Sequence, residues 1–172
     1  MRSFALVIAT LLLLSSCTDD PGPIEPKPSA PAATAPSPPA QVGEGTPEGA
    51  AAFVSHYIEV LNFAANTGDV SPLTALSSPR CDGCREYIGL YKDVYAAGGN
   101  FEGGEWSPSD FELEVRRKTT HVFVRIDADE GRVKPDASSD TRTEKAFDGD
   151  VVFEVDTNGK DRKVHKLERL KP

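Results

Sequence analysis

The sequence predicts an α+β fold in which N-terminal helices pack on one face of an antiparallel sheet. Apolar residues recur at helical spacing from Thr46 to about Ala97, and after Gly99 they alternate with polar residues at the period of a β-strand. Helices that come first and strands that follow favour helices gathered on one side of the sheet, because alternating elements would instead build a parallel sheet.

The first sixteen residues are predicted to form a signal peptide. Arg2 supplies a positive charge, and an almost uninterrupted apolar run extends from Phe4 to Leu14. These eleven residues would make a helix of about 16 Å, whereas the hydrocarbon core of a bilayer is about 30 Å thick. The run is too short to span a membrane, which favours a segment that is cleaved off.

Cys17 is predicted to carry a lipid anchor. The tetrapeptide Leu14-Ser15-Ser16-Cys17 resembles the lipobox of bacterial lipoproteins, and the resemblance implies a diacylglyceryl group on the thiol and cleavage just before Cys17. Two acyl chains hold a protein at a membrane stably, where one chain would be marginal. The predicted partner is therefore the extracytoplasmic face of the cell membrane. A plain secretory signal, with this cysteine free or paired elsewhere, is the alternative.

Residues 17–45 are predicted to be the lipidated cysteine and a disordered linker. Thr18 to Gly45 contains eight of the 14 prolines of the chain and almost no large apolar residue. Such a segment buries too little apolar surface to offset its ordering entropy, and its prolines favour polyproline-II. The segment would reach about 85 Å when fully extended, so we expect the folded part, residues 46–172, to stand away from the membrane as a single α+β domain.

Three helices are predicted at the start of this domain. The first begins after Thr46 as N-cap, with Pro47 at the first helical position, and ends at Gly68. A short second helix covers residues 71–76, and a third covers residues 82–97. The apolar positions of the first and third helices include Phe53, Tyr57, Leu61, Tyr87, Ile88, Tyr91, Val94 and Tyr95.

Four strands are predicted after the helices, because apolar and polar residues alternate there. They cover residues 111–115, 122–128, 151–155 and 163–170, and a hairpin turn at residues 156–159 joins the last two. The polar residues 129–140 are predicted to be a loop or an irregular hairpin.

Residues 46–99 resemble an uncharacterised family of actinobacterial lipoproteins with a domain of unknown function, on the stretches TPEGAAAFVSHYIEVLNFAANTGDVSPLTALSSPRCDGCREYI and VYAAGG. The order of helices and strands also resembles the nuclear-transport-factor-2-like fold, which includes ketosteroid isomerases and many non-catalytic proteins. These resemblances imply a curved, cone-like sheet and a location in the cell envelope. They imply no activity, no cofactor and no catalytic residue.

Cys81 and Cys84 form the sharpest motif of the domain, a C-x-x-C that is followed by the third predicted helix. A structural disulfide is the preferred interpretation, because only these two cysteines remain if Cys17 is lipidated and the compartment is oxidising. A thiol–disulfide site is the second interpretation, although the strand that precedes such motifs in thioredoxins is missing. Half of a zinc site is the third, and it lacks histidines at ligand spacing.

The charge and the missing motifs exclude several functions. The formal net charge is -8, which disfavours binding to nucleic acid. No P-loop, no G-x-S-x-G and no H-E-x-x-H occurs, so we predict no catalytic residue, no cofactor and no metal. The basic segment 160–171 could dock an acidic partner, but an exposed edge strand kept soluble by lysine explains it as well.

Four large amphipathic side chains are candidates to line a pocket: Tyr57, Tyr91, Tyr95 and Trp106. An ordinary aromatic core explains them equally simply. The leading functional hypothesis is a lipid-anchored, non-enzymatic domain that binds a small ligand or an envelope protein. The alternatives are a small isomerase or dehydratase with a cone-shaped pocket, and a thiol–disulfide protein that uses Cys81 and Cys84.

Overall fold

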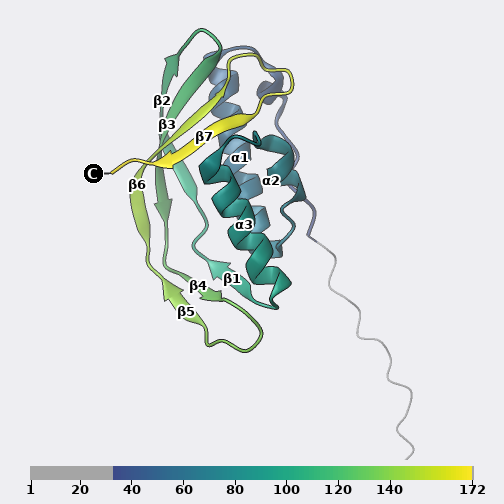
Figure 1. The fold of residues 1–172 in the computed structure, drawn as a ribbon. Helices are drawn as coiled ribbons and strands as arrows, with labels where there is room; N and C mark the ends of the chain where they lie inside the picture. Colours follow the sequence, from purple (N-terminus) through teal and green to yellow (C-terminus); the bar gives the residue numbers. More distant parts are fainter. Residues whose placement is uncertain (1–32, 172) are drawn as a thin grey trace, which may run out of the picture. The chain divides into compact units, whose positions relative to one another are not determined.

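A computed structural model describes residues 33–171 of the chain, and these residues form three α-helices, a short 3-10 helix and seven strands (Figure 1). The predicted signal peptide, Cys17 and the first part of the predicted linker lie outside the described residues. In chain order the elements are η1 (Ala40–Gly43), α1 (Pro47–Thr67), α2 (Ser71–Leu76), α3 (Asp82–Ala96), β1 (Asn100–Gly103), β2 (Ser107–Val115), β3 (Thr119–Ala128), β4 (Gly131–Lys134), β5 (Arg142–Glu144), β6 (Phe147–Asp156) and β7 (Val164–Arg169).

The helices begin and end where the sequence predicts. The hydroxyl of Thr46 accepts a hydrogen bond from the backbone N–H of Gly49 at 3.0 Å, and this caps α1. Gly68 ends α1 in the left-handed conformation, with φ of 76°. Cys81 is the N-cap of α3, which ends one residue before the predicted Ala97. The α+β class is confirmed, with helices first and antiparallel strands after them.

A four-stranded antiparallel sheet in the order β2-β3-β6-β7 forms one wall of the core. Val122 lies opposite Phe153 and Val124 opposite Val151, so the buried residues of the two central strands share one face. The helices cover this face of the sheet (Figure 1). The four predicted strands are the four strands of this sheet. Three of them, β2, β3 and β6, are three to five residues longer than predicted, and β7 is two residues shorter.

A second antiparallel sheet, in the order β1-β4-β5, was not predicted. Residues 129–140 are predicted to be a loop or irregular hairpin, whereas β4 occupies Gly131–Lys134 and pairs with both β1 and β5. These strands have three or four residues each; β5 is exposed, β1 is half exposed, and β4 buries Gly131 and Val133. Strands this short show no readable alternation, which explains why the pattern missed them.

The folded region begins before Thr46. Residues 40–45 are predicted to belong to the linker, but they form a strap that consists of η1 and the two residues after it, and Val42 packs against the core. Arg162, which is only 3% exposed, donates hydrogen bonds to the backbone carbonyls of Val42 and Glu44 at 3.2 and 2.9 Å. The sequence did not reveal this strap, because its partner lies about 120 residues away in the chain.

Candidate functional site

The candidate site is a cavity of about 360 Å³ where α3 faces both sheets. Its walls come from α1, α3, β1, β3, β4, β5, β6 and β7, so it lies where the two sheets and the helices meet. The volume is at the lower end of the range for small-molecule sites, and concave, mostly apolar pockets of this kind are the usual places where proteins bind ligands. We call this hollow the aromatic cavity.

Five aromatic side chains make the apolar wall of the aromatic cavity. Tyr87 meets the indole of Trp106 edge-on, with ring centroids 5.4 Å apart, and Tyr91 meets Phe101 edge-on at 5.3 Å. Phe147 stacks on Trp106 at 6.3 Å with an interplanar angle of 29°. Edge-on and stacked pairs of this kind hold each ring in a defined orientation, so the wall is rigid and largely pre-formed.

Arg169, the last residue of β7, lies over this wall. Its guanidinium carbon is 4.3 Å from the ring centroid of Phe147, 5.4 Å from that of Trp106 and 6.0 Å from that of Tyr87. A guanidinium stacked on aromatic faces keeps the N–H groups at its edge available for hydrogen bonds. The arrangement places a positively charged, planar donor at the aromatic cavity.

The rim of the aromatic cavity is basic. Arg132 pairs with Glu102, and Arg142 pairs with Glu144 at 3.2 Å. Lys145 and Arg169 also line the cavity, and within residues 33–171 neither forms an ion pair. The lining therefore holds four cations against two carboxylates, Asp129 and Glu144, in a protein whose net charge is -8.

Asn62 positions the backbone of the aromatic wall. Its side-chain amide donates to the carbonyl of Trp106 at 2.9 Å, and its carbonyl oxygen accepts from the N–H of Trp106 at 2.9 Å. This two-point contact ties the segment between β1 and β2 to the middle of α1. Without it, a tryptophan on a short connection would have more freedom of orientation.

Of the four predicted pocket residues, Tyr91 and Trp106 line the aromatic cavity and the other two do not. Tyr57 is wholly buried in the core, where it bonds the hydroxyl of Ser77 at 3.0 Å and burial raises its pKa to about 12. Tyr95 donates to the carbonyl of Ala65 at 2.8 Å. Burial also raises the pKa of Tyr91, so its phenol stays neutral.

Four further residues line this site without having been predicted from the sequence as pocket residues: Tyr87, Phe101, Phe147 and Arg169. Tyr87 belongs to the apolar positions of the predicted third helix, and that pattern does not show which cavity it lines. Phe101 lies in β1 and Phe147 is the first residue of β6. These strands belong to different sheets, so no local pattern in the sequence brings the two rings together. Arg169 was counted within the basic segment 160–171, where charge alone did not separate a stacked arginine from exposed lysines.

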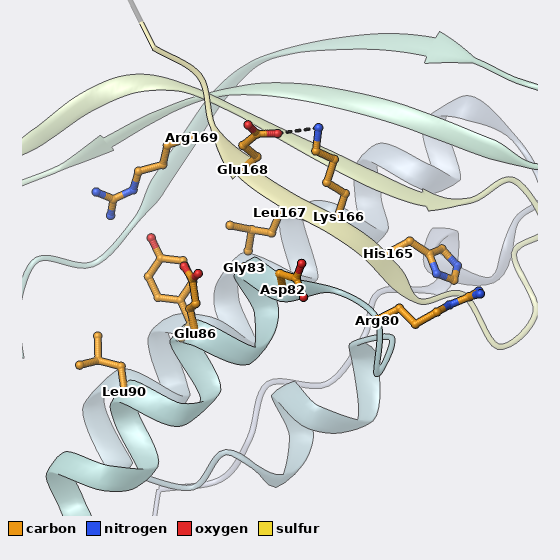
Figure 2. A pocket seen from close by; sticks show the side chains of 11 residues that line it. Arg80, Asp82, Gly83, Glu86, Leu90, His165, Lys166, Leu167, Glu168 and Arg169 are labelled. Atoms are coloured by element: carbon orange, nitrogen blue, oxygen red, sulfur yellow. Dashed lines mark ion pairs between the residues drawn. The ribbon is translucent and has the colours of Figure 1, made fainter.

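A wider, open groove of about 750 Å³ adjoins the aromatic cavity (Figure 2). It lies between the first half of α3 and the strand β7, and it shares Tyr87, Leu90 and Arg169 with the cavity. Figure 2 shows Arg169 extending from β7 above α3, at the end of the groove away from Arg80 and His165. Arg169 thus stands at the boundary between the groove and the cavity.

Cys81 and Cys84 form a disulfide, and both residues are wholly buried. The sulfur of Cys81 accepts from the N–H of Cys84 at 3.2 Å, and the neighbouring Ser78 donates its N–H to the carbonyl of Val164 at 2.8 Å. The disulfide therefore closes the first turn of α3 where this helix meets β7. Thiol–disulfide exchange requires a thiolate to reach a sulfur, and burial obstructs that approach.

The described part of the chain offers little for acid–base or metal chemistry. Among the residues that line the aromatic cavity there is no histidine, and the two carboxylates, Asp129 and Glu144, are exposed. Within residues 33–171 no cluster of three or more metal-ligating side chains occurs. No helix in this range is long and apolar enough to cross a bilayer.

One solved structure supports the fold, and a second, weaker match carries no argument. The intermembrane space region of the chloroplast protein ARC6 superposes with a TM-score of 0.51 at 9% identity, over 73% of this chain and 97% of that one. Rv3472, a protein of unknown function from Mycobacterium tuberculosis, gives a TM-score of 0.42 at 11% identity, over 76% of this chain and 79% of that one. No curated protein matches this sequence. The profile of a family of unknown function, DUF6318, matches residues 27–162, which is most of the chain, and the protein therefore belongs to this family.

Proposed function

We propose that this protein is a non-enzymatic binding module of the cell envelope, held at the membrane by a lipid on Cys17, and that the aromatic cavity binds a small ligand. The observation that carries the proposal is the pre-formed wall of Tyr87, Tyr91, Phe101, Trp106 and Phe147, with the stacked Arg169 beside it. An apolar wall with a few placed polar groups gives both affinity and orientation.

The arrangement favours binding over an isomerase or dehydratase reaction. Proton transfer of that kind needs an acid or base held inside an apolar site, where burial adjusts its pKa towards the working pH. The cavity carboxylates Asp129 and Glu144 are instead exposed, and the buried phenol of Tyr91 has a raised pKa, which makes it a poor base at neutral pH. A nuclear-transport-factor-2-like cone without a catalytic group remains compatible with a binding role.

The chain offers an intrinsic reporter for this proposal, because Trp106 is its single tryptophan and lies in the cavity wall. The neutral dye phenylnaphthylamine should bind one site per chain and accept excitation energy from Trp106. Phe147→Ala should weaken this binding about fivefold, since one aromatic contact is worth about 1 kcal/mol. The measurement is a titration followed by dye emission with excitation of the tryptophan.

Phe123→Ala is the matched control, because Phe123 belongs to β3 of the same sheet and lies outside the cavity lining. Its affinity for the dye should equal that of the unmodified chain, and thermal unfolding should show that both variants are folded. An absence of saturable dye binding, or equal losses in the two variants, would count against the cavity as a binding site.

The anchor is tested separately from the cavity. Expressed in an actinobacterial host with its complete leader, the chain should be recovered with the membrane, and mass spectrometry should find Cys17 as the lipidated first residue. Cys17→Ala should lose both the lipid and the cleavage, whereas Ser15→Ala should keep both, because it retains a small residue before the cysteine. A processed, membrane-bound Cys17→Ala protein would rule out lipidation.

A further inference from the structure

We infer that the ligand of the aromatic cavity has an anionic group, a carboxylate, sulfonate or phosphate, attached to a planar or apolar body, and that Arg169 and Lys145 bind this group at the cavity mouth. The inference rests on the proposed function, and it names the chemical class of the ligand. The cavity alone predicts only an apolar ligand. The anionic group of the ligand is inferred from the two cations and their surroundings.

Arg169 is prepared to bind an anion. Its guanidinium lies 4.3 Å from the centroid of Phe147, and stacking restricts the long side chain before any ligand arrives. A guanidinium presents parallel N–H donors at its edge, which match the oxygen pair of a carboxylate or the oxygens of a phosphate. Less side-chain entropy is then lost on binding, because the stack has already limited the side chain.

The pairing of the rim cations distinguishes two groups. Arg132 and Arg142 are neutralised by Glu102 and Glu144, so they contribute little net field. Arg169 and Lys145 form no ion pair within the described residues, although acidic residues outnumber basic ones in the chain, 27 to 19. In so acidic a protein, two unpaired cations beside an apolar cavity indicate a local preference for negative charge.

Tyr87 adds a hydroxyl close to the same place. Burial raises the pKa of this phenol, and the positive charge of Arg169 partly offsets the effect of burial, as expected when the two groups are close together. The neutral phenol keeps its proton and can donate a hydrogen bond to an anion beside the guanidinium. Arg169 and Tyr87 both also face the open groove, so the charged end of the ligand would remain near water.

The test uses two dyes with the same fused-ring skeleton, one anionic and one neutral. Anilinonaphthalenesulfonate has a sulfonate, and phenylnaphthylamine has none. We expect the unmodified full chain to bind the sulfonate at least about tenfold more tightly, which corresponds to one charge-assisted hydrogen-bonded contact. The readout is the dissociation constant of phenylnaphthylamine divided by that of anilinonaphthalenesulfonate. Each constant is obtained from energy transfer from Trp106.

Arg169→Met and Lys145→Met should each lower this ratio, Arg169→Met to near unity, because methionine retains an apolar chain and removes the charge. Arg116→Met removes an exposed cation paired with Glu114, outside the cavity, and should leave the ratio unchanged. Lys145 is exposed, so its replacement keeps the test usable if the Arg169 variant does not fold.

The outcomes separate the inference from the proposed function. If neither dye binds, the proposed function is wrong. If both bind with equal affinity, or if the neutral dye binds more tightly, the cavity is a binding site and the anionic class is wrong. A preference for the sulfonate that survives both Arg169→Met and Lys145→Met also overturns the inference, because the charge would then be recognised elsewhere.

Discussion

Replacing Arg162 by methionine should lower the free energy of unfolding by about 3 kcal/mol, one of the two largest effects that we expect from a single substitution in this protein. Arg162 as a residue is 3% exposed, and its guanidinium donates to four backbone carbonyls, those of Asp156, Val42, Glu44 and Thr157. It also lies 5.8 Å from the ring centroid of Phe53 in α1. Methionine fills a similar volume but leaves these carbonyls without a donor.

The loss should concentrate where the arginine joins the strap to the hairpin between β6 and β7. Burial lowers the pKa of Arg162, but an arginine remains charged at any ordinary pH, so the effect should not depend on pH between 5 and 8. Hydrogen exchange of the amides of residues 40–45 should accelerate together with those of residues 157–161. Urea unfolding measures the change in stability.

Arg116→Met provides the matched control for stability as well. Arg116 is half exposed and pairs with Glu114, so its loss should cost less than about 1 kcal/mol. Equal losses of unfolding free energy for the two substitutions would show that burial and the four hydrogen bonds do not make Arg162 more stabilising than an exposed arginine.

The strap itself can be removed by starting the chain at Thr46. In that shortened chain the carbonyls of Val42 and Glu44 are absent, and Arg162→Met should cost about half as much as in the longer chain. Full additivity of the two changes would mean that Arg162 does not clamp the strap. This experiment also tests where the folded domain begins.

The parts of the fold that the sequence predicted are those whose signals are local. Thr46, Pro47 and Gly68 delimit α1 through caps that involve residues three or four positions apart. The alternation in β3 gave its buried face correctly from Val122 through Ala128, whereas the strand begins three residues earlier, at Thr119. The short strands β1, β4 and β5 were missed, because three or four residues are too few to show a period.

The site was predicted less completely than the fold, for a physical reason. Tyr91 and Trp106 were identified by residue type alone, whereas Phe147 and Arg169 reach the cavity only through the pairing of β3, β6 and β7. Arg162 and Arg169 belong to one basic segment, yet the first is buried among carbonyls and the second is stacked on rings. Sequence shows the charge of an arginine, and tertiary contacts decide its role.

A methyl group added at two glycines of α3 should change stability in opposite directions. Gly83 lies against β7, and a Cβ at this position would overlap the backbone carbonyl oxygen of Leu167 (Figure 2). We expect Gly83→Ala to cost about 3 kcal/mol, because an overpacked contact with backbone has no flexible side chain that can move away. Gly89 has no atom within 4 Å of the same added methyl group, and alanine there should stabilise the helix by about 0.5–1 kcal/mol.

The two elements at the Gly83 contact cannot separate easily. β7 is paired with β6 along its length, and the Cys81–Cys84 disulfide closes the turn of α3 that contains Gly83. Separation of α3 from β7 would also open the groove and move Tyr87 away from Arg169. Gly83→Ala should therefore weaken dye binding in the aromatic cavity, whereas Gly89→Ala should leave it unchanged.

Urea unfolding of both variants gives the comparison, and the difference between them should be about 3.5–4 kcal/mol, the sum of the two expected effects. The chemical change and the helix are the same, so a difference larger than the helix-propensity gain of about 1 kcal/mol reports the contact of Gly83 with β7. Equal stability of the two alanine variants would show that α3 does not pack closely on β7 at Gly83. The groove between these two elements, which ends at Arg169, would then also have a different shape.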